Sequence, residues 1–414
     1  MIINVKDNCL VRKENKKIME DPKERLTTCI PTVELERRWK AAREMMRERK
    51  VDFLVMRNDE EFMGGYVKWF SDFSPRHSNA FSLIFPVDDE MTFISMGGTP
   101  PADAFPPQWA VRGIKRRIGS PYFSSIHYTS TYDAELAVGV LKEKKRATIG
   151  LVGSSFIPMT FYAYLRKHLV GYKFVDLTDQ IDQIKAIKSP EELDLIKHTA
   201  EIQDVAMEHV RKILRPGLRD FEVLAEAQYS VVKQGSERQL ILAGSSPPGV
   251  PTRWQFRHFQ NRVIREGDQF NLLIEVNGPG GFYTEIGRVF SIGKPSQELQ
   301  DAFGVAVEAQ ELTVNLLKPG ANPRDIWDAN NEFLQKKGYQ PESRLYAHGQ
   351  GYSLVERPAV RYDEPMKIQA GMNITVHPFA INTKVWAVVC DNYLVTETGI
   401  NPCLHKFPRE IIVV

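Results

Sequence analysis

One glycine-bounded stretch, residues 267–293, constrains the fold more than any other part of the chain. It reads GDQFNLLIEVNGPGGFYTEIGRVFSIG, two apolar runs on either side of a glycine-rich turn. A turn of this composition between β-type runs predicts an antiparallel hairpin. Glu275 and Glu285 flank the turn. Two carboxylates on otherwise apolar strands need a metal ion, a cation or a shared proton to offset their charge, unless both lie on a solvated face.

The length and the charge of the chain narrow the class of protein. At 414 residues it is long enough for two domains. Its 54 basic and 52 acidic residues give a formal charge of +2, which offers no attraction to nucleic acid or to an anionic membrane. No apolar run approaches the roughly 20 residues of a membrane span, and the four cysteines have no paired spacing. We expect a cytoplasmic protein with reduced thiols and with neither nucleic acid nor a membrane as partner.

Alternating strand and helix patterns fill the first part of the chain. A helical pattern begins at Thr32, and further along two apolar runs are joined by the acidic turn 87–90, which predicts a second hairpin. Ser189 is followed by a proline and, three positions on, by a glutamate, the start signals of a helix. We expect a smaller α/β domain at residues 1–186 and a second domain at residues 187–414, with an overall α+β fold.

Three later segments place polar residues in apolar or glycine-rich surroundings. They read AHGQGY around His348, GMNITVHP ending after His377, and AVVCDNYLV around Cys390. One histidine in a strand is more often a core residue than a ligand. Three such segments after a hairpin that carries two glutamates predict one shared site.

In this order, the segments resemble the catalytic domain of the creatinase, prolidase and methionine aminopeptidase superfamily, known as the pita-bread fold. The segments that carry the resemblance are GFYTEIGRVFSIG, HGQGY, GMNITVHP and LVTETG, and KAIKSPEELDLIKHTAEI is similar to the start of the first catalytic helix. The resemblance implies a C-terminal pita-bread catalytic domain behind a creatinase-type N-terminal domain. It also implies a homodimer in which the N-terminal domain of one subunit closes the active site of the other.

The metal positions of the family are altered in this chain. Aminopeptidases of the family bind two divalent ions through two aspartates, a histidine and two glutamates. The corresponding positions hold Glu275 (or its neighbour Ile274), Glu285, His348, His377 and Cys390. Since only the histidine is unchanged, we expect no two-metal centre and no cofactor. The alternative is that the last four of these residues bind a single softer divalent ion such as zinc.

The metal-free hypothesis follows the resemblance to creatinase, where a histidine ahead of the Gly-Asp turn moves a proton while water splits a carbon–nitrogen bond. His258 lies ten residues before Asp268 and fits that position. An imidazole suits the role of general acid/base because it accepts and returns protons near neutral pH. The catalytic residues Glu285, His348 and His377 would then orient the substrate and the water.

Arginines and aromatic residues indicate the substrate. Arg76 resembles the arginine that creatinase sends across the dimer interface to the substrate carboxylate, and Arg357 lies near the position of a second. Guanidinium groups bind carboxylates as a fork. We also expect Tyr352, Trp254 and Glu275 to contact the substrate.

The sequence therefore predicts a hydrolase that cleaves a carbon–nitrogen bond of a small, carboxylate-bearing molecule without a metal. Three alternatives stay open. The first is a metal-dependent Xaa-Pro aminopeptidase or dipeptidase with altered ligands. The second is a lyase on the same fold, because a base beside a carboxylate can also abstract a proton. The third is a binding protein that keeps the fold and has no catalytic activity.

Overall fold

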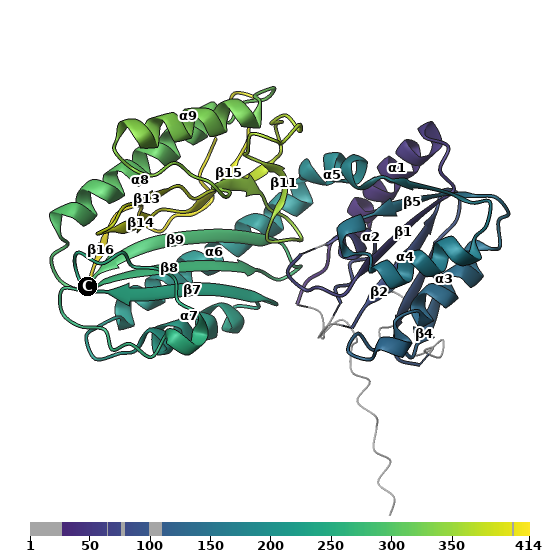
Figure 1. Ribbon diagram of the computed structural model, residues 1–414, viewed down its shortest axis with the longest axis horizontal. Helices are drawn as coiled ribbons and strands as arrows, with labels where there is room; N and C mark the ends of the chain where they lie inside the picture. Colours follow the sequence, from purple (N-terminus) through teal and green to yellow (C-terminus); the bar gives the residue numbers. More distant parts are fainter. Residues whose placement is uncertain (1–26, 64, 76–78, 99–109, 400) are drawn as a thin grey trace, which may run out of the picture.

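The computed structural model describes residues 27–63, 65–75, 79–98, 110–399 and 401–414. The chain forms two parts that lie side by side, with α5 (Thr178–Ala186) near the junction and α6 (Pro190–Ile213) leading from it into the second part (Figure 1). Arg76 lies outside the described residues. None of the described helices is both long enough and apolar enough to span a lipid bilayer.

The first part is a six-stranded mixed sheet with helices on both faces. The strands follow the order β4-β3-β2-β1-β5-β6, and β2 and β3 form the predicted antiparallel hairpin. The strands are β1 (Phe53–Asn58), β2 (Phe81–Pro86), β3 (Met91–Met96), β4 (Ile114–Ser120), β5 (Thr148–Val152) and β6 (Lys173–Asp176). The helices are α1 (Thr32–Glu48), α2 (Tyr66–Ser71), α3 (Tyr132–Leu141), α4 (Met159–His168) and α5 (Thr178–Ala186).

The central strand β1 shows why this part has three layers. Successive side chains of a strand point to opposite faces of the sheet. Leu54 and Met56 pack in the core that contains α1 and α2, whereas Phe53 and Val55 pack in the core that contains α3 and α4. Since both faces of β1 are buried, its first four residues form a continuous apolar run instead of an alternating one.

The second part repeats one arrangement, a pair of helices followed by a small sheet. The first set consists of α6 (Pro190–Ile213), α7 (Asp220–Lys233), β7 (Gln239–Ser246), β8 (Gln269–Asn277) and β9 (Tyr283–Ser291). The second set consists of α8 (Gln297–Leu316), α9 (Pro323–Lys336), β10 (Ala347–Gly349), β11 (Glu356–Ala359), β12 (Asn373–Val376) and β15 (Asp391–Leu394). The short strands β13 (Phe379–Ile381) and β14 (Trp386–Val388) pair with each other, and β16 (Ile412–Val413) joins the edge of β9.

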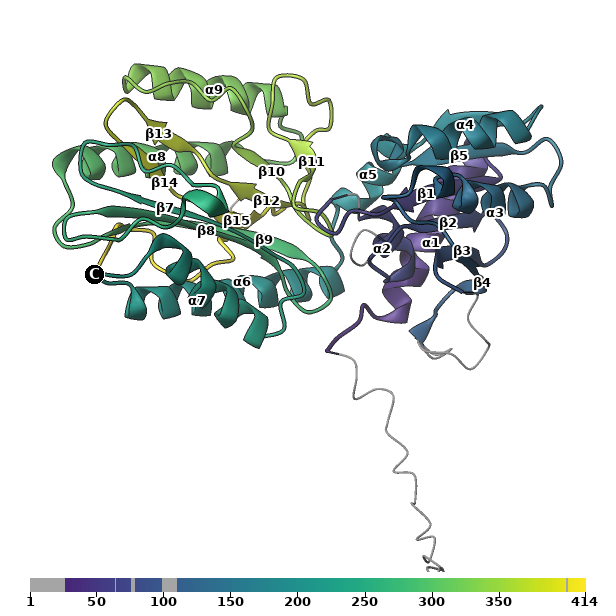
Figure 2. The same cartoon turned by 60° about the horizontal axis from the view of Figure 1, so that its bottom comes forward.

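The strands of the second part lie between the two helix pairs. Figures 1 and 2 show α6 and α7 on one side of the strands and α8 and α9 on the other. The sheets have the orders β16-β9-β8-β7 and β11-β10-β12-β15. They meet where Gly287 of β9 bridges to Cys390, the residue just before β15. Side chains from β8, β9, β10 and β12 can therefore meet in the interior.

The predicted helix start at Ser189 is confirmed. The Ser189 side chain accepts a hydrogen bond from the backbone N–H of Glu192, and the Glu192 carboxylate accepts one from the backbone N–H of Ser189. Pro190 occupies the first turn, where its missing N–H is not needed. This cap fixes the point at which the chain enters the second part.

The predicted hairpin at residues 267–293 is confirmed as β8 and β9, with Glu275 directly opposite Glu285. Alternation puts Leu272, Ile274 and Ile286 into the core that α6 and α7 cover, so the two glutamates point to the opposite face of the sheet. That face meets the second sheet and not solvent. Glu275 is 7% exposed and Glu285 is 4% exposed, which excludes a solvated hairpin.

Candidate active site

Three potential metal ligands converge in the space between the two sheets. Glu285 extends from β9, His348 from β10, and His377 follows the last residue of β12. One ligand atom from each of the three lies within 4.8 Å of the other two, and all three side chains are buried. Pairing of β10 with β12 sets His348 opposite Thr375, two residues before His377. The backbone of the sheets thus fixes the geometry of the group, which we call the ligand cluster.

Both histidines of the ligand cluster are held in the neutral form. Burial lowers the pKa of His348 to about 4, and burial together with the neighbouring His348 lowers the pKa of His377 well below its usual value. His348 Nδ1 lies 3.0 Å from the carbonyl oxygen of Gly349, so this nitrogen carries the hydrogen and donates it. The lone pair is then on Nε2, which lies 3.9 Å from a Glu285 carboxylate oxygen. A neutral imidazole with its free nitrogen facing a carboxylate has the form that binds metal ions.

The two glutamates form a buried pair in which at least one carboxyl group retains a proton near neutral pH. Burial raises the pKa of Glu285 to about 7. Burial and then the charge of Glu285 raise the pKa of Glu275 well above its usual value. The Gln350 side chain donates a 2.7 Å hydrogen bond to Glu275 Oε1. An amide donor fixes the position of this carboxyl group without supplying the positive charge that would neutralise it.

A polar network connects the ligand cluster to the second sheet. Asn392 accepts a 2.7 Å hydrogen bond from the backbone N–H of Glu285. It donates to the side-chain oxygens of Gln350 (2.9 Å) and Asn373 (3.1 Å). Since Gln350 in turn holds Glu275, one buried amide positions both glutamates. We call Gln350, Asn373 and Asn392 the amide network.

Cys390 lies beside the ligand cluster as a neutral thiol. Its sulfur is 3.3 Å from the Thr375 hydroxyl and 3.5 Å from the backbone oxygen of Glu285. Burial, with the charge of Glu285 as the next cause, raises the pKa of the thiol well above its usual value. Cys390 is a weaker candidate ligand than the three residues of the cluster because its sulfur is not among the ligand atoms that lie within 4.8 Å of one another.

The ligand cluster fits a divalent ion. Two neutral imidazoles and one carboxylate are donors that suit zinc, iron, cobalt or manganese. Among the described residues, one group of at least three potential ligands satisfies the 4.8 Å separation, and it is this one. Glu275 and Cys390 are outside this group, so only three of the five metal positions of the family provide ligand atoms close enough to share one ion.

Two other predicted residues, His258 and Trp254, lie on the connection between β7 and β8 and outside the ligand cluster. His258 is exposed on a short 3₁₀ helix (Arg257–Phe259), where its ring contacts Phe256 and Phe259. Trp254, on the same connection between β7 and β8, is half-buried against Phe379 and Trp386. Phe379 lies 5.9 Å, ring to ring, from His377, so Trp254 belongs to a wall that reaches the cluster.

Tyr352 and Arg357 have partners within the protein. Tyr352 is buried, stacks on Phe282 at 4.1 Å, and its hydroxyl lies 3.4 Å from the buried guanidinium of Arg38 in the first part of the chain. Arg357 makes ion pairs with Glu364 (2.5 Å) and Asp179 (2.7 Å). Tyr352 therefore packs between the two parts of the chain, and the guanidinium of Arg357 is already paired with carboxylates.

Sequence reasoning missed the amide network and Thr375. Gln350 stands between two glycines next to His348, and Asn392 occupies a strand that is otherwise apolar. Polar side chains at such positions are a readable signal, since a buried amide needs partners.

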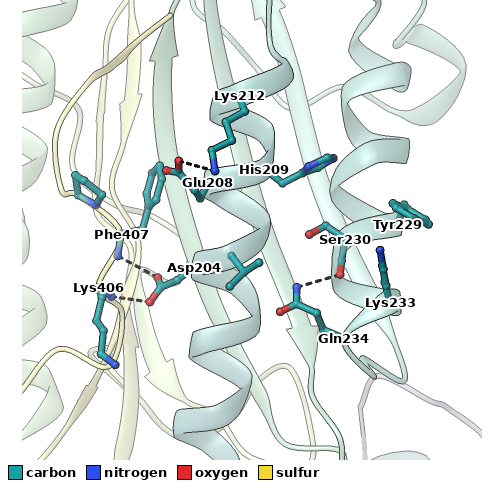
Figure 3. A pocket seen from close by; sticks show the side chains of 12 residues that line it. Asp204, Glu208, His209, Lys212, Tyr229, Ser230, Lys233, Gln234, Lys406 and Phe407 are labelled. Carbon is teal, nitrogen blue, oxygen red and sulfur yellow. Dashed lines mark hydrogen bonds and ion pairs between the residues drawn. The ribbon is translucent and has the colours of Figure 1, made fainter.

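A separate hollow lies on the outside of the molecule. It is a groove of about 810 Å³ between α6, α7 and residues 406–408 (Figure 3). Several of its polar side chains form hydrogen bonds or ion pairs with neighbouring residues. Asp204 accepts from the backbone N–H groups of Lys406 and Phe407, and Glu208 pairs with Lys212. The groove brings no group of potential ligands together, whereas the interior does.

The comparisons with known proteins agree with this site. Residues 194–397 match the metallopeptidase family M24, and residues 38–187 match the creatinase/prolidase N-terminal domain. The chain belongs to the creatinase and prolidase superfamily, with the pita-bread fold that the sequence predicted. It is a hydrolase of the creatinase and Xaa-Pro peptidase type.

Individual relatives cover most of the chain. A protein of Sinorhizobium fredii described as an uncharacterized hydrolase/peptidase is 28% identical over 93% of this chain and 98% of its own length. The Xaa-Pro dipeptidase of Pyrococcus furiosus is 26% identical over 65% of this chain and 76% of its own. Among solved structures, the X-Pro aminopeptidase of Thermotoga maritima superposes with a TM-score of 0.75 at 20% identity, covering 91% of this chain and 99% of its own.

The expectation that the site works without a cofactor is wrong. The match to metallopeptidase family M24 spans the whole ligand cluster, and the cluster itself brings three suitable donors together. The sequence argument failed because it counted conserved ligand types at five positions. It could not see that Glu285 and two histidines remain close enough to bind one ion.

Proposed function

We propose that the protein is a metal-dependent Xaa-Pro dipeptidase or aminopeptidase that holds one divalent ion at Glu285, His348 and His377. The observation that carries this proposal is the approach of their ligand atoms to within 4.8 Å of one another in a buried space. Relatives described as Xaa-Pro dipeptidases support the choice of substrate class. The metal-dependent alternative from the sequence thus becomes the main hypothesis.

The available ligand atoms support a site for one metal ion, whereas aminopeptidases of the family bind two. A second ion would need Glu275 and Cys390 as additional anionic ligands. Gln350 already binds one oxygen of Glu275, and neither Glu275 nor Cys390 belongs to the group of ligand atoms that lie within 4.8 Å of one another. What remains is a site with two neutral ligands and one anionic ligand, which leaves coordination positions for water or a substrate oxygen.

Peptide-bond hydrolysis requires that water adds to the carbonyl carbon, that the carbon–nitrogen bond breaks, and that the leaving nitrogen gains a proton. Glu285, His348 and His377 would hold a divalent ion, which would supply Lewis-acid activation of the carbonyl group and of water. Glu275 is placed to handle the proton, since it lies opposite Glu285 on the neighbouring strand and its pKa is raised. Gln350 binds one of its oxygens, which leaves the other to carry the proton that the leaving nitrogen gains, and the proton released by the attacking water would then return to Glu275.

Other predictions from the sequence stay predictions. They are the homodimer with an active site closed by the partner subunit, the cytoplasmic location, and the division into domains at residues 186 and 187. The roles of Arg76, His258, Tyr352 and Arg357 also await experiment, and for the last two the contacts inside the protein favour a structural role.

The test is hydrolysis of Xaa-Pro dipeptides by protein that has been stripped with a chelator and then supplied with zinc, manganese or cobalt. We expect no turnover after stripping and recovery with at least one ion, followed by release of free proline. Turnover that is equal before and after chelation would contradict the proposal. So would the absence of turnover with every ion and every dipeptide.

A further inference from the structure

Two buried glutamines lie behind the ligand cluster, one on each of the two longest helices of the second part. Gln203 lies on α6 and Gln310 on α8, and both residues are fully buried. The two helices lie on opposite sides of the strands (Figures 1 and 2). A buried amide needs partners for both its nitrogen and its oxygen. The partners of these two amides connect them to the candidate metal ligands.

Gln203 binds the peptide group that leads into Glu285. Its side-chain nitrogen donates a 2.6 Å hydrogen bond to the carbonyl oxygen of Thr284, and its side-chain oxygen accepts one of 2.8 Å from the Thr284 hydroxyl. At the other end of the same peptide group, the N–H of Glu285 donates to Asn392 at 2.7 Å. Because a peptide group is planar, partners at both ends fix its orientation and the point from which the Glu285 side chain extends.

Gln310 binds the peptide group that leads into His377 in the same way. Its side-chain nitrogen donates to the carbonyl oxygen of Val376 at 3.0 Å. At the other end of that peptide group, the N–H of His377 donates to the carbonyl oxygen of Tyr346 at 2.7 Å. In each half of the second part, therefore, a glutamine from a long helix holds the carbonyl group directly before a candidate metal ligand.

A buried ion pair fixes the second glutamine in turn. The Gln310 nitrogen also donates to Asp391 at 3.1 Å, and Asp391 pairs with the buried guanidinium of Arg288 at 2.6 Å. Arg288 donates further to the backbone oxygens of Gly287 (2.8 Å) and Cys390 (2.9 Å), the two residues at which the sheets meet. Gln310 therefore belongs to a network that reaches from α8 to the point of contact between the two sheets.

The third residue of the ligand cluster is held differently. His348 lies inside β10, which pairs with β11 on one side and with β12 on the other. Glu285 has β8 on one side and the amide network on the other, and His377 follows the last residue of β12. Strand pairing thus holds His348 on both sides, whereas helix side chains help to hold the peptide groups of the other two ligands.

We propose that Gln203 and Gln310 are positioning residues that set the separation of Glu285 from His377, and so set the affinity of the ligand cluster for its metal ion. The inference rests on the metal site of the proposed function and names residues outside the cluster on which that site depends. Ligands that are held near the bonding geometry before the ion arrives bind it more tightly. Loss of either amide would release one peptide group and widen the range of distances between the two ligands.

The test measures zinc affinity by competition between the metal-stripped protein and a chromophoric chelator. Wild type is compared with Gln203→Met, Gln310→Met, the double variant and the control Gln260→Met. Methionine is an unbranched side chain that fills similar space without an amide. Gln260 is also buried, at 3% exposed, and donates to the backbone oxygen of Gln255 at 2.9 Å, but it lies in the connection between β7 and β8. The control therefore repeats the substitution away from the peptide groups that precede the ligands.

We expect each single variant to bind zinc about 10-fold more weakly than wild type, the double variant about 100-fold more weakly, and Gln260→Met within about twofold. The visible absorption spectrum of cobalt-loaded protein reports the geometry of the ligands. It should change in Gln203→Met and Gln310→Met and match wild type in the control, a difference that a loss of stability alone would not produce. Zinc affinity within about twofold of wild type in both folded single variants, or an equal weakening in Gln260→Met, would overturn the inference.

Two further measurements keep the test decisive. If circular dichroism shows that a methionine variant does not fold, Gln203→Asn or Gln310→Asn replaces it, since asparagine keeps the amide but ends one bond short of the carbonyl group. The same weakening is expected, and wild-type affinity would contradict the inference. Hydrolysis of Xaa-Pro dipeptides by the zinc-loaded samples separates the inference from the proposed function. Wild type that binds zinc and cleaves no dipeptide refutes the function alone, whereas wild type that binds no zinc refutes both.

Discussion

The ligand cluster and the outer groove differ in what their side chains are free to do. The groove between α6 and α7 is a hollow of about 810 Å³ in which His209 pairs with Glu226 and Glu208 pairs with Lys212 (Figure 3). The cluster is buried, its histidines are neutral and its ligand atoms converge within 4.8 Å. The comparison teaches that a candidate active site is recognised by potential ligand atoms that converge in a buried space. The size of a hollow does not identify it.

The largest expected effect separates the two regions by their histidines. Replacing His348 or His377 with Ala should lower kcat/KM for Xaa-Pro hydrolysis by at least about 100-fold, because even the partners of metal ligands contribute 10- to 100-fold. His209→Ala removes a histidine of the groove that pairs with Glu226 at 2.9 Å and should stay within about twofold of wild type. The measurement is steady-state hydrolysis with saturating zinc or manganese. A comparable loss of kcat/KM in His209→Ala would contradict the assignment of catalysis to the ligand cluster alone.

Ion pairs should differ between the interior and the groove in their effect on stability. Glu356 is buried between Lys185 (3.1 Å) and Lys188 (2.9 Å), and although burial alone would raise its pKa, the two ammonium groups lower it from 4.5 to about 2. Its carboxylate therefore stabilises the fold above pH 4.5, and that stabilisation, about 3 kcal/mol, is lost as the pH falls toward 2.

Urea unfolding at pH 7 and at pH 3 measures this effect. Wild type should lose stability between the two values, whereas Glu356→Gln should start less stable and change less. Glu208→Gln, in the groove, removes partly exposed ion pairs and should keep the pH dependence of wild type within about 0.5 kcal/mol. If Glu356→Gln lost as much stability between pH 7 and pH 3 as wild type, the buried ion pair would not be the cause of the pH dependence.

Amide side chains provide a third contrast. Asn392→Ala leaves the backbone N–H of Glu285 and the side-chain oxygens of Gln350 and Asn373 without partners, so we expect a loss of about 2 kcal/mol in the free energy of unfolding. Gln234→Ala removes two partly buried hydrogen bonds in the groove, to the backbone oxygens of Ser230 (3.0 Å) and Ile202 (3.5 Å), and should cost about 0.5 kcal/mol or less. Chemical denaturation of both variants gives the two numbers. Equal losses would mean that the amide network does not hold the glutamates in place.

The smallest expected effect is in the groove itself. Tyr229 is 58% exposed, and Lys233 lies over its ring at 5.7 Å. Since neither approaches the ligand cluster, Tyr229→Ala and Lys233→Ala should leave kcat and KM for dipeptides within about twofold of wild type. A larger change in either constant would show that the groove is coupled to catalysis.

Local sequence signals predicted the parts of the fold that depend on few residues. The whole helix cap is formed by Ser189, Pro190 and Glu192. The hairpin is formed by the two apolar runs that carry Glu275 and Glu285. Each needs only neighbours in sequence or one adjacent strand. Such features can be read from a single chain.

The parts that could not be predicted depend on contacts between distant segments. Gln350 holds Glu275, 75 positions away in the chain, and only three-dimensional packing reveals this contact. Tyr352 stands beside the HGQG segment in sequence, but the first part of the chain covers it through Arg38. The metal hypothesis was misjudged for the same reason, since distance between donors decides binding and residue type alone does not.

The most direct test of the central claim is the number of zinc ions bound per chain, measured by mass spectrometry after stripping, reloading and gel filtration. The account predicts about one ion in wild type and in His209→Ala, and far less than one in the double variant His348→Ala/His377→Ala. Circular dichroism serves as the control that the double variant is folded. Two ions per chain in wild type, none in wild type, or one retained in the folded double variant would contradict the single site at Glu285, His348 and His377.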